Sequence, residues 1–273
     1  MKKRLDLILF EKGYFETKNA ASAAILAGNV KIGEKIVDKA GEQFDPDKLF
    51  DPNSKEKIEI KVMPYVSRGG LKLEGAIKAF NINLKDRICI DMGASTGGFT
   101  DCMLQFGAKK VYAIDVGYNQ LAWKLREDKR VISKEKTNVK NCTFFDIYGC
   151  ESLLDDEMPN FMSMDLSFIS IKKVLDNIIN FVQKNSEFVF LIKPQFEAKR
   201  EEIQKGGVVR DEKIHNKIIE DIKDYAKNLE LNFQGVIKSP IQGAKQGNVE
   251  YLIYFKRGQI LTLCLQLLKQ PNL

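Results

Sequence analysis

The spacing of apolar residues changes along the chain, and residues 1–62 form the first pattern. The run RLDLILFEKG has apolar residues at helical spacing, and Thr17 is placed to cap a second helix that continues to Gly28. The runs NVKI and KIV flank a Gly-Glu turn and predict a hairpin, and KIEIKV predicts one further strand. We therefore expect a small α+β domain over residues 1–62.

A second pattern follows a short linker at residues 63–67, which contains Pro64. In residues 68–258, strand-like runs alternate with helix-like runs: DRICIDMG, KVYAIDVG, RVIS, FMSMDLS and EFVFLIK against LKLEGAIKAF, GFTDCMLQFG, NQLAWKLRED, SIKKVLDNIINFV and a long polar helix over residues 211–229. This alternation predicts an α/β fold with a doubly wound, mostly parallel sheet. LNFQGVIKS and VEYLIYF have no helix between them, so they predict an antiparallel hairpin at one edge.

The last segment, residues 259–273, is apolar, and we expect it to pack as an extra helix on the core or as a contact between chains. No apolar run reaches the roughly 18 residues that span a bilayer, so no membrane segment is expected. The basic start of the chain lacks the apolar core of a signal peptide, because Asp6 and Glu11 interrupt it. Five widely spaced cysteines without a CxxC pair indicate reduced thiols and a cytoplasmic protein.

Composition narrows the function only slightly. The chain has 273 residues, of which 44% are hydrophobic, and a formal charge of +6. This mild basic excess fits nucleic-acid binding but is common in other proteins. His215 is the single histidine, which excludes HExxH and multi-histidine metal sites. We predict that His215 is a solvated surface residue and that the protein holds no metal.

The stretch DMGASTGGFTD, residues 91–101, joins an apolar strand to a helix, which is where open α/β sheets bind nucleotides. Glycines there let the backbone approach a ligand, and the start of the helix offers free N–H groups to a polar group. Gly93, Gly97 and Gly98 do not fit GxGxxG, and no lysine follows as in a P-loop. The alternative is a tight turn that holds no ligand.

Asp115 favours a ligand over that alternative. It ends the next strand, KVYAID, where a carboxylate could accept hydrogen bonds from two ribose hydroxyls. A strand-end acid, spaced glycines and a second strand-end acid together resemble the S-adenosylmethionine site of class I, Rossmann-like methyltransferases.

Four ionisable residues are expected at the ligand edge of the sheet, each at a helix start or a strand end: Lys72, Asp165, Lys193 and Glu250. Singly, each has an ordinary explanation, because a strand-end lysine usually reaches solvent and a strand-end carboxylate usually caps the next helix. Together they indicate a catalytic cluster. A partly desolvated lysine beside a second lysine can accept the proton of a weakly acidic hydroxyl nucleophile.

Motifs in series then carry a family resemblance. YVSRGGLKLEGA, DMGASTGGFTD, AIDVGYNQLAWKLR, KTNVKN, DLSFISI, LIKPQFE and GNVEYLIYF resemble the successive motifs of the TlyA family of ribosomal-RNA 2′-O-methyltransferases, historically called haemolysins, with an FtsJ-like catalytic domain. RLDLIL and AGNVKIGEKIVDKAGEQFD resemble an S4 RNA-binding domain. The resemblance covers nearly the whole chain, with the S4-like domain at residues 1–62 and the FtsJ-like domain at residues 68–258.

The resemblance implies a Lys-Asp-Lys-Glu tetrad formed by Lys72, Asp165, Lys193 and Glu250. Lys193 would activate the ribose 2′-hydroxyl, Lys72 and Glu250 would orient it, and Asp165 would hold the lysines in place. The implied methyl donor is S-adenosylmethionine, bound by Asp91, Gly93, Ala94, Ser95, Thr96, Gly97, Gly98, Asp115 and Asn138. Glu135 and Thr137 are alternatives to Asn138 for the contact with adenine. Transfer from a sulfonium needs positioning and the removal of one proton, so no metal is required.

The resemblance also implies ribosomal RNA as the partner, with cytidines of 16S and 23S rRNA as targets. Residues 1–40 carry eight basic and five acidic side chains, so charge alone fits a solvated surface equally well. RNA contacts are expected from Arg4, Lys18 and Lys31 in the S4-like domain, and from Arg68. Many family members have Ser-Arg where this chain has Thr17-Lys18, which would weaken a bidentate phosphate contact while keeping the charge.

Residues 195–210 leave two alternatives open. The segment is polar and contains Gly206 and Gly207, so it predicts either a loop that grips substrate phosphates or a solvated linker. Two other functions are weighed against methyl transfer. One is a non-catalytic RNA-binding factor in ribosome assembly, against which the intact tetrad argues. The other is a membrane-lytic protein, for which the sequence offers no spanning segment or basic amphipathic helix. No oligomeric state is predicted.

Overall fold

The computed structural model describes residues 2–258, except for residues 16, 27, 53, 55, 62 and 242–247. The chain divides into two compact units, Met1–Pro64 and Tyr65–Leu273. The apolar tail expected at residues 259–273 lies outside the described residues. Within the part of the chain that the structure describes, no helix is long and apolar enough to cross a membrane.

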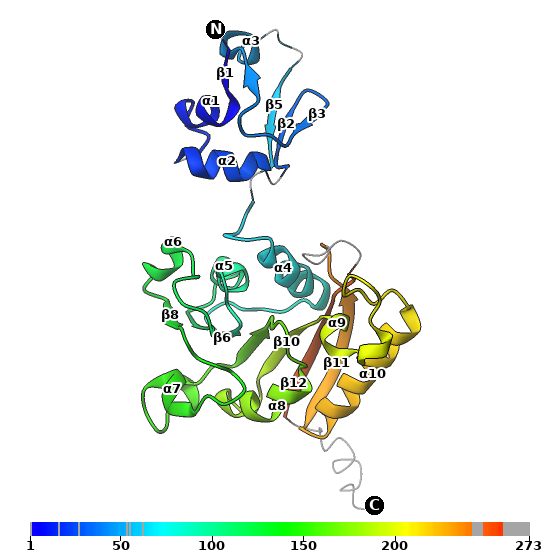
Figure 1. Ribbon diagram of the computed structural model, residues 1–273. Helices are drawn as coiled ribbons and strands as arrows, with labels where there is room; N and C mark the ends of the chain where they lie inside the picture. The colour runs from blue at the N-terminus through cyan, green and yellow to red at the C-terminus, as the bar shows by residue number, and fades with distance from the viewer. Residues whose placement is uncertain are drawn as a thin grey trace, which may run out of the picture. The chain divides into compact units, whose positions relative to one another are not determined.

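The first unit packs two helices against a small sheet (Figure 1). Helices α1 (Leu5–Glu11) and α2 (Lys18–Leu26) share a core with an antiparallel sheet of order β3-β2-β5. Its strands are β2 (Val30–Ile32), β3 (Lys35–Val37) and β5 (Ile58–Ile60). Thr17 Oγ1 accepts a hydrogen bond from Ala20 N at 3.1 Å, so the predicted cap of the second helix is confirmed.

Three short elements of this unit carry no periodic signal in the sequence. Strand β1 (Lys3–Arg4) pairs antiparallel with β4 (Gln43–Phe44), and α3 (Pro46–Leu49) follows β4. The Asp45 carboxylate accepts from Asp47 N at 3.2 Å and starts α3, whose first residue is a proline. Elements of two to four residues are too short for apolar periodicity to reveal.

The second unit is built on a seven-stranded sheet of order β11-β12-β10-β9-β6-β7-β8. Its strands are β6 (Ile88–Met92), β7 (Lys110–Ile114), β8 (Val131–Lys134), β9 (Phe161–Met164), β10 (Glu187–Ile192), β11 (Leu231–Lys238) and β12 (Tyr251–Arg257). Strands β8, β7, β6, β9 and β10 are parallel, whereas β12 is antiparallel to β10 and to β11. The predicted mostly parallel sheet with an antiparallel edge pair is therefore confirmed.

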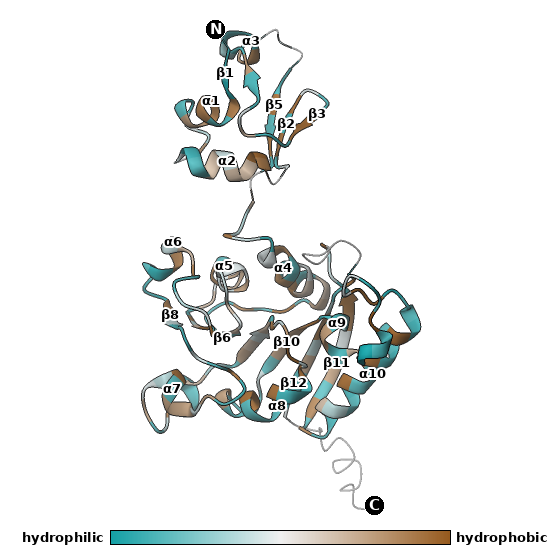
Figure 2. Ribbon diagram, in the orientation of Figure 1, coloured by the Kyte–Doolittle hydropathy of each residue, from teal (hydrophilic) through white to brown (hydrophobic). Residues whose placement is uncertain are grey.

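Helices cover both faces of this sheet, as Figure 1 shows. On one face α4 (Gly69–Phe80) and α5 (Gly98–Gln105) pack over Cys89 and Val111; on the other, α8 (Lys172–Ile178) and α10 (Glu212–Lys227) pack over Ile90 and Met162. The central strands β6 and β10 are largely apolar and α10 is apolar along one side only (Figure 2), as a doubly covered parallel sheet requires. The remaining helices are α6 (Trp123–Arg126), α7 (Phe144–Tyr148), α9 (Pro194–Glu197) and the 3-10 turns η1 (Asp155–Glu157), η2 (Ile179–Phe181) and η3 (Arg200–Glu202).

Two expectations are wrong in this unit. The run NQLAWKLRED is helical only over Trp123–Arg126, because the residues before it form a loop whose Gly117 N–H is bound by Asp115. His215 is not a solvated surface residue: its side chain is buried on the inner side of α10, with 2% of its surface exposed. The polar letters around His215 belong to the outer side of an amphipathic helix, and His215 shares the inner side with Ile218, Ile219 and Ile222.

Candidate functional site

The glycine-rich turn connects β6 to α5 and requires glycine at two positions. Gly93 and Gly97 have φ angles of +88° and +94°, which other residues rarely adopt. A Cβ atom on Gly93 would lie 2.5 Å from the backbone oxygen of Asp165, and one on Gly97 would lie 2.3 Å from the Leu125 side chain. The turn is therefore pressed against the segment that follows β9 and against α6.

Asp115, the residue after β7, holds two loops by their backbones. One carboxylate oxygen accepts from Ser95 N at 2.7 Å and the other accepts from Gly117 N at 2.6 Å. These bonds fix Asp115 at the carboxyl end of the parallel strands, on the rim of a pocket of about 510 Å³. Both of its oxygens retain a second lone pair, which a ligand hydroxyl could use.

Four of the expected cofactor residues line this pocket of about 510 Å³, which is called the larger pocket because a smaller one adjoins it: Gly93, Ser95, Asp115 and Asn138. Of the alternatives to Asn138, Thr137 also lines it, whereas Glu135 is ion-paired with Arg126. Several apolar and polar lining residues were not predicted from the sequence: Val116, Gln120, Val139, Leu166, Ser167, Phe168 and Ile169. Three of them, Val116, Val139 and Leu166, directly follow a predicted residue along the chain, so proximity to a predicted residue was the available signal for these three.

The other expected cofactor residues shape the turn and are not among the residues that line the pocket. Asp91 is fully buried, and its carboxylate accepts from Thr100 Oγ1 at 2.7 Å and from Ser163 Oγ at 2.9 Å. Burial raises the pKa of Asp91 to about 7, against the opposing effect of these two hydroxyls. Ala94 N donates to Ile114 O at 3.0 Å and Thr96 O accepts from Ala122 N at 3.1 Å, while Gly98 packs closely on Ser67.

The four expected catalytic residues form two ion pairs, one buried and one partly buried. Lys72 Nζ, on α4, lies 2.5 Å from Glu250 Oε2, which precedes β12; the two side chains are 11% and 3% exposed. Lys193 Nζ, after β10, lies 2.5 Å from Asp165 Oδ1, after β9; these side chains are 12% and 22% exposed. Lys193 Nζ also donates to Ser167 Oγ at 3.0 Å. Each lysine is thus paired with one carboxylate, so Asp165 binds Lys193, and Lys72 has a different partner.

A smaller pocket of about 320 Å³ adjoins the larger one and contains Lys193 and Glu250 in its lining. Ser167 and Phe168 line both pockets, so the segment after β9 separates them. Phe168 has a φ of +64°, which is unusual for an aromatic residue, and 89% of its surface is exposed. Its ring lies 5.0 Å from that of Phe196, between ring centroids. An exposed aromatic ring held in a strained conformation therefore stands where the pockets meet.

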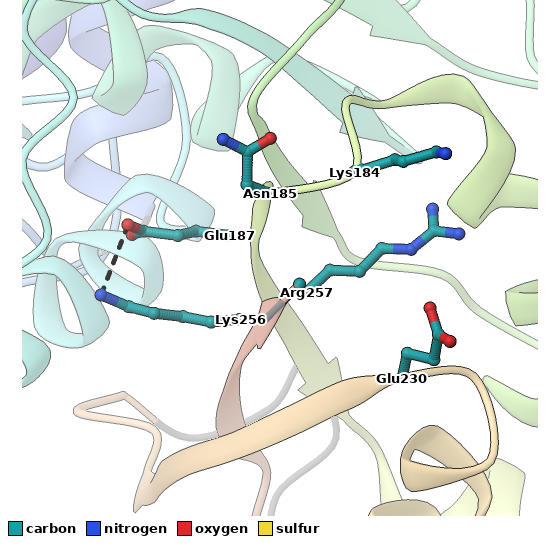
Figure 3. Close-up of a pocket in the computed structure, with 7 residues that line it drawn as sticks. Lys184, Asn185, Glu187, Glu230, Lys256 and Arg257 are labelled. Atoms are coloured by element: carbon teal, nitrogen blue, oxygen red, sulfur yellow. Dashed lines mark ion pairs between the residues drawn. The ribbon is translucent and has the colours of Figure 1, made fainter. Parts of the chain in front are cut away.

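A different pocket, of about 680 Å³, lies at the opposite edge of the sheet, where β10 begins and β12 ends. Figure 3 shows its lining, including Lys184, Glu230 and Arg257, and the ion pair between Glu187 and Lys256. Glu187 also accepts from Arg87 and Tyr254, so its charge is already balanced. Open α/β sheets bind ligands at the carboxyl ends of their parallel strands, and this pocket is at the other end.

The expected RNA-contacting residues differ in whether their positive charges are paired with carboxylates of the protein. Arg4 donates to both carboxylate oxygens of Asp6, at 3.0 and 2.7 Å, and this pairing is the main reason that the pKa of Asp6 is lowered. Lys31 lies 3.5 Å from Glu34 and 3.9 Å from Glu59. Lys18 is exposed at the start of α2, and Arg68 is exposed before α4, in the second unit. Arg4 therefore supports a buried carboxylate, whereas Lys18 offers an exposed cation.

Comparisons with known proteins identify the family to which each domain is similar. The family model of FtsJ-like methyltransferases matches residues 65–257, and that of the S4 domain matches residues 3–48. An rRNA methyltransferase candidate of Bacillus subtilis named YqxC is 44% identical, over 93% of this chain and 85% of its own length. The 16S/23S rRNA (cytidine-2′-O)-methyltransferase TlyA of Mycobacterium tuberculosis is 37% identical, over 93% and 89%. A solved structure of a hemolysin candidate from Streptococcus thermophilus is 41% identical, covers 94% of this chain and 89% of that one, and superposes with a TM-score of 0.70.

Proposed function

The chain belongs to the FtsJ-like methyltransferase family, with an S4 domain ahead of the catalytic domain, and we propose that it methylates the ribose 2′-hydroxyl of cytidines in 16S or 23S ribosomal RNA. The observation that carries this proposal is the junction of the two pockets at residues 165–168. The ion pair of Lys193 with Asp165 stands at that junction, because Asp165 lines the larger pocket and Lys193 the smaller one. A donor and an acceptor bound in adjoining pockets would meet there.

The residues of the larger pocket fit S-adenosylmethionine. Asp115 has lone pairs left for the ribose hydroxyls, and Val116, Val139 and Leu166 offer apolar surface for the adenine, which Asn138 would contact at its polar edge. We assign the amino-acid end of the donor to the turn at residues 93–97. The buried Asp91 carboxylate accepts hydrogen bonds from Thr100 and Ser163 and so holds the start of that turn in place, and we assign it a positioning role.

The smaller pocket fits the ribose of the target nucleotide. When bound in the larger pocket, S-adenosylmethionine supplies an electrophilic methyl group. Lys193, in its neutral amine form, takes the proton of the 2′-hydroxyl as the oxygen attacks the methyl carbon and S-adenosylhomocysteine leaves, which requires Nζ to be within hydrogen-bonding reach of that oxygen. Asp165 and Ser167 hold Nζ in place, and the Asp165 carboxylate offsets positive charge on the donor side. Lys72 is ion-paired with Glu250 and holds that carboxylate in the lining of the smaller pocket, where it orients the ribose.

The first unit supplies sequence-independent affinity for RNA in this proposal. Lys18 and Lys31 contact backbone phosphates from α2 and β2, and Arg68 makes a phosphate contact of its own from the second unit. Phe168 offers its exposed ring to the base of the target nucleotide, because unpaired RNA bases stack on aromatic side chains. Stacking on Phe168 would hold the target nucleotide outside an RNA helix, with its ribose next to Lys193.

Methyl transfer to ribosomal subunits tests the proposal. Purified protein is incubated with labelled S-adenosylmethionine and with 30S or 50S subunits from cells that lack the gene, and 2′-O-methylated nucleotides are mapped. We expect labelled 2′-O-methylcytidine, absent with Lys193→Ala. Tight RNA binding without any transfer would indicate a non-catalytic assembly factor instead, and methylation of base atoms would exclude the assigned acceptor.

A further inference from the structure

Residues 204–209 form one wall of the smaller pocket through Gly207, which is in its lining. Gln204 and Val208 pair as an antiparallel bridge around a tight turn whose Gly206 and Gly207 have φ angles of +95° and +75°. Ile203, which directly precedes this segment, also lines the pocket, together with Lys193 and Glu250. The position of this wall therefore sets the width of the space in which the ribose would lie.

His215 ties this wall to the strand that follows Glu250. Its Nε2 lies 2.8 Å from Val209 O, and its Nδ1 lies 2.9 Å from the hydroxyl of Tyr251. A carbonyl oxygen can only accept, so Nε2 carries a hydrogen, and in the neutral ring Nδ1 accepts from the Tyr251 hydroxyl. One buried side chain thus joins a residue two positions after Gly207 to the residue directly after Glu250.

Asn248 makes a second tie to the same wall. Its Nδ2 donates to Gly207 O at 3.2 Å, and the side chain is 3% exposed. Asn248 and Glu250 are both in the lining of the smaller pocket. The wall is therefore held at Gly207 and at Val209 by two polar side chains, and both ties lead to the chain on either side of Glu250.

We propose that His215 and Asn248 are positioning residues that hold segment Gln204–Val209 as a fixed wall of the acceptor pocket, and so seat the target ribose against Lys193. This inference rests on the proposed function. An apolar residue would fill the core beneath α10 equally well, as Ile218 and Ile222 do nearby. A buried imidazole with both nitrogens bonded instead fixes the direction of two chain segments, which packing alone does not.

Conservative variants separate positioning from packing. His215→Gln keeps an amide N–H for Val209 O and an oxygen for the Tyr251 hydroxyl, whereas His215→Leu keeps volume but neither bond. Tyr251→Phe removes one hydroxyl. Its matched control is Tyr254→Phe, on the same strand: Tyr254 is 5% exposed against 7% for Tyr251, and its hydroxyl donates to Glu187 at 2.7 Å, away from this wall.

The measurements are the KM for ribosomal subunits, the Kd for S-adenosylmethionine, the thermal midpoint and the amide exchange of residues 204–209. We expect His215→Leu, Tyr251→Phe and Asn248→Ala to raise the KM for subunits by roughly tenfold, as loss of one buried hydrogen bond would. The Kd for S-adenosylmethionine stays unchanged, and amide exchange of residues 204–209 becomes faster. His215→Gln should return both the KM for subunits and the exchange rate to their wild-type values. Tyr254→Phe should alter the thermal midpoint as much as Tyr251→Phe does. It should change neither the KM for subunits nor the amide exchange of residues 204–209.

Equal KM values for Tyr251→Phe and Tyr254→Phe, or unaltered exchange of residues 204–209 in His215→Leu, would overturn the inference. Failure of the proposed function looks different. In that case the wild-type protein transfers no methyl group to RNA, while the exchange data still report whether His215 and Asn248 hold the wall.

Discussion

Lys193 Nζ lies 2.5 Å from Asp165 Oδ1, and the two residues directly follow the neighbouring parallel strands β10 and β9. Ser167 Oγ accepts a hydrogen bond from the same nitrogen at 3.0 Å. Lys193 also lines the smaller pocket. The pair therefore orients a lysine toward the place where an acceptor hydroxyl would lie.

Replacing Lys193 by arginine tests whether it acts through proton transfer. Arginine keeps a cation beside Asp165 but does not give up its proton at any ordinary pH, so it cannot serve as a base. We expect Lys193→Arg and Lys193→Ala both to lower kcat by roughly 100-fold or more, in the range of general-base contributions. Single-turnover transfer to ribosomal subunits measures this.

The donor Kd provides the control for these variants. It should remain within about twofold of the wild-type value, since Lys193 is not in the lining of the larger pocket. Substantial activity of Lys193→Arg would show that the positive charge suffices, and the role of Lys193 as a base would then be wrong.

Asp115→Ala should weaken donor binding for two reasons. It removes the carboxylate assigned to the ribose hydroxyls, and it releases the N–H groups of Ser95 and Gly117 that shape the pocket. We expect the Kd for S-adenosylmethionine to rise by roughly tenfold to 100-fold, as loss of hydrogen bonds to a charged acceptor would cause. Calorimetry measures the Kd, and Asp156→Ala, on an exposed turn, is the control. Unchanged donor affinity would exclude the assigned role.

The parallel sheet made much of this site predictable. Residues that end apolar strands are brought to one edge by the topology, so Asp115, Asp165 and Lys193 could be grouped from the spacing of strands alone. Gly93 and Gly97 could be identified because a strand-to-helix turn of this kind needs left-handed backbone. These inferences depend only on local patterns repeated along the chain.

Side-chain pairing was not predictable in the same way. Lys72 and Glu250 are 178 positions apart, and no local pattern says which of two carboxylates will meet which of two lysines. His215 was assigned to the surface because its neighbours in sequence are polar, whereas its depth depends on which side of α10 packs on the sheet. The left-handed backbone at Phe168 could not be predicted from the sequence either, because glycine or asparagine is ordinarily found at such a position.

Phe168 should trade stability for activity. Asparagine tolerates left-handed backbone much better than phenylalanine, and the Phe168 ring is 89% exposed, so little packing is lost on its removal. We expect Phe168→Asn to leave the unfolding free energy unchanged or raise it by about 1 kcal/mol. Transfer to subunits should fall by roughly tenfold, the loss of one stacked base. Phe168→Tyr, which keeps a ring, is the control. Full activity in Phe168→Asn would contradict a stacking role.

Arg4 and Lys18 should respond differently to substitution. Lys18→Ala removes an exposed cation, so we expect unchanged thermal stability and a slope of log affinity against log salt that is smaller by about 1. Arg4→Ala leaves the buried Asp6 carboxylate without its bidentate partner, so the first unit should unfold at lower temperature. Salt-dependent RNA binding and thermal unfolding of each variant check this. A salt slope equal to that of wild type would exclude Lys18 from the phosphate contacts.

Asp91 predicts a pH dependence of stability with an unusual sign. Burial raises its pKa from the ordinary 3.8 to about 7 in the folded protein, so between these values the folded state keeps a proton that the unfolded state has lost. The contribution of Asp91 is therefore most favourable below about pH 4, and is lost as pH rises toward 7, by about 1 kcal/mol per pH unit. Paired surface carboxylates such as Asp128, whose pKa is lowered by Arg130, act in the opposite direction, so only a difference measurement isolates Asp91.

Asp91→Asn supplies that difference, because a neutral amide retains an oxygen acceptor for Thr100 or Ser163 and does not titrate. Denaturant unfolding of both proteins at pH 5, 6, 7 and 8 should show that the variant gains stability relative to wild type between pH 5 and pH 7, with no further change above. Asp101→Asn is a matched control: it alters another buried carboxylate, on α5 directly after Thr100, that is bonded to Val66 N and to Lys124. A constant difference between Asp91→Asn and wild type from pH 5 to pH 8 would mean that Asp91 is already ionised in the folded state, held by its two hydroxyl donors.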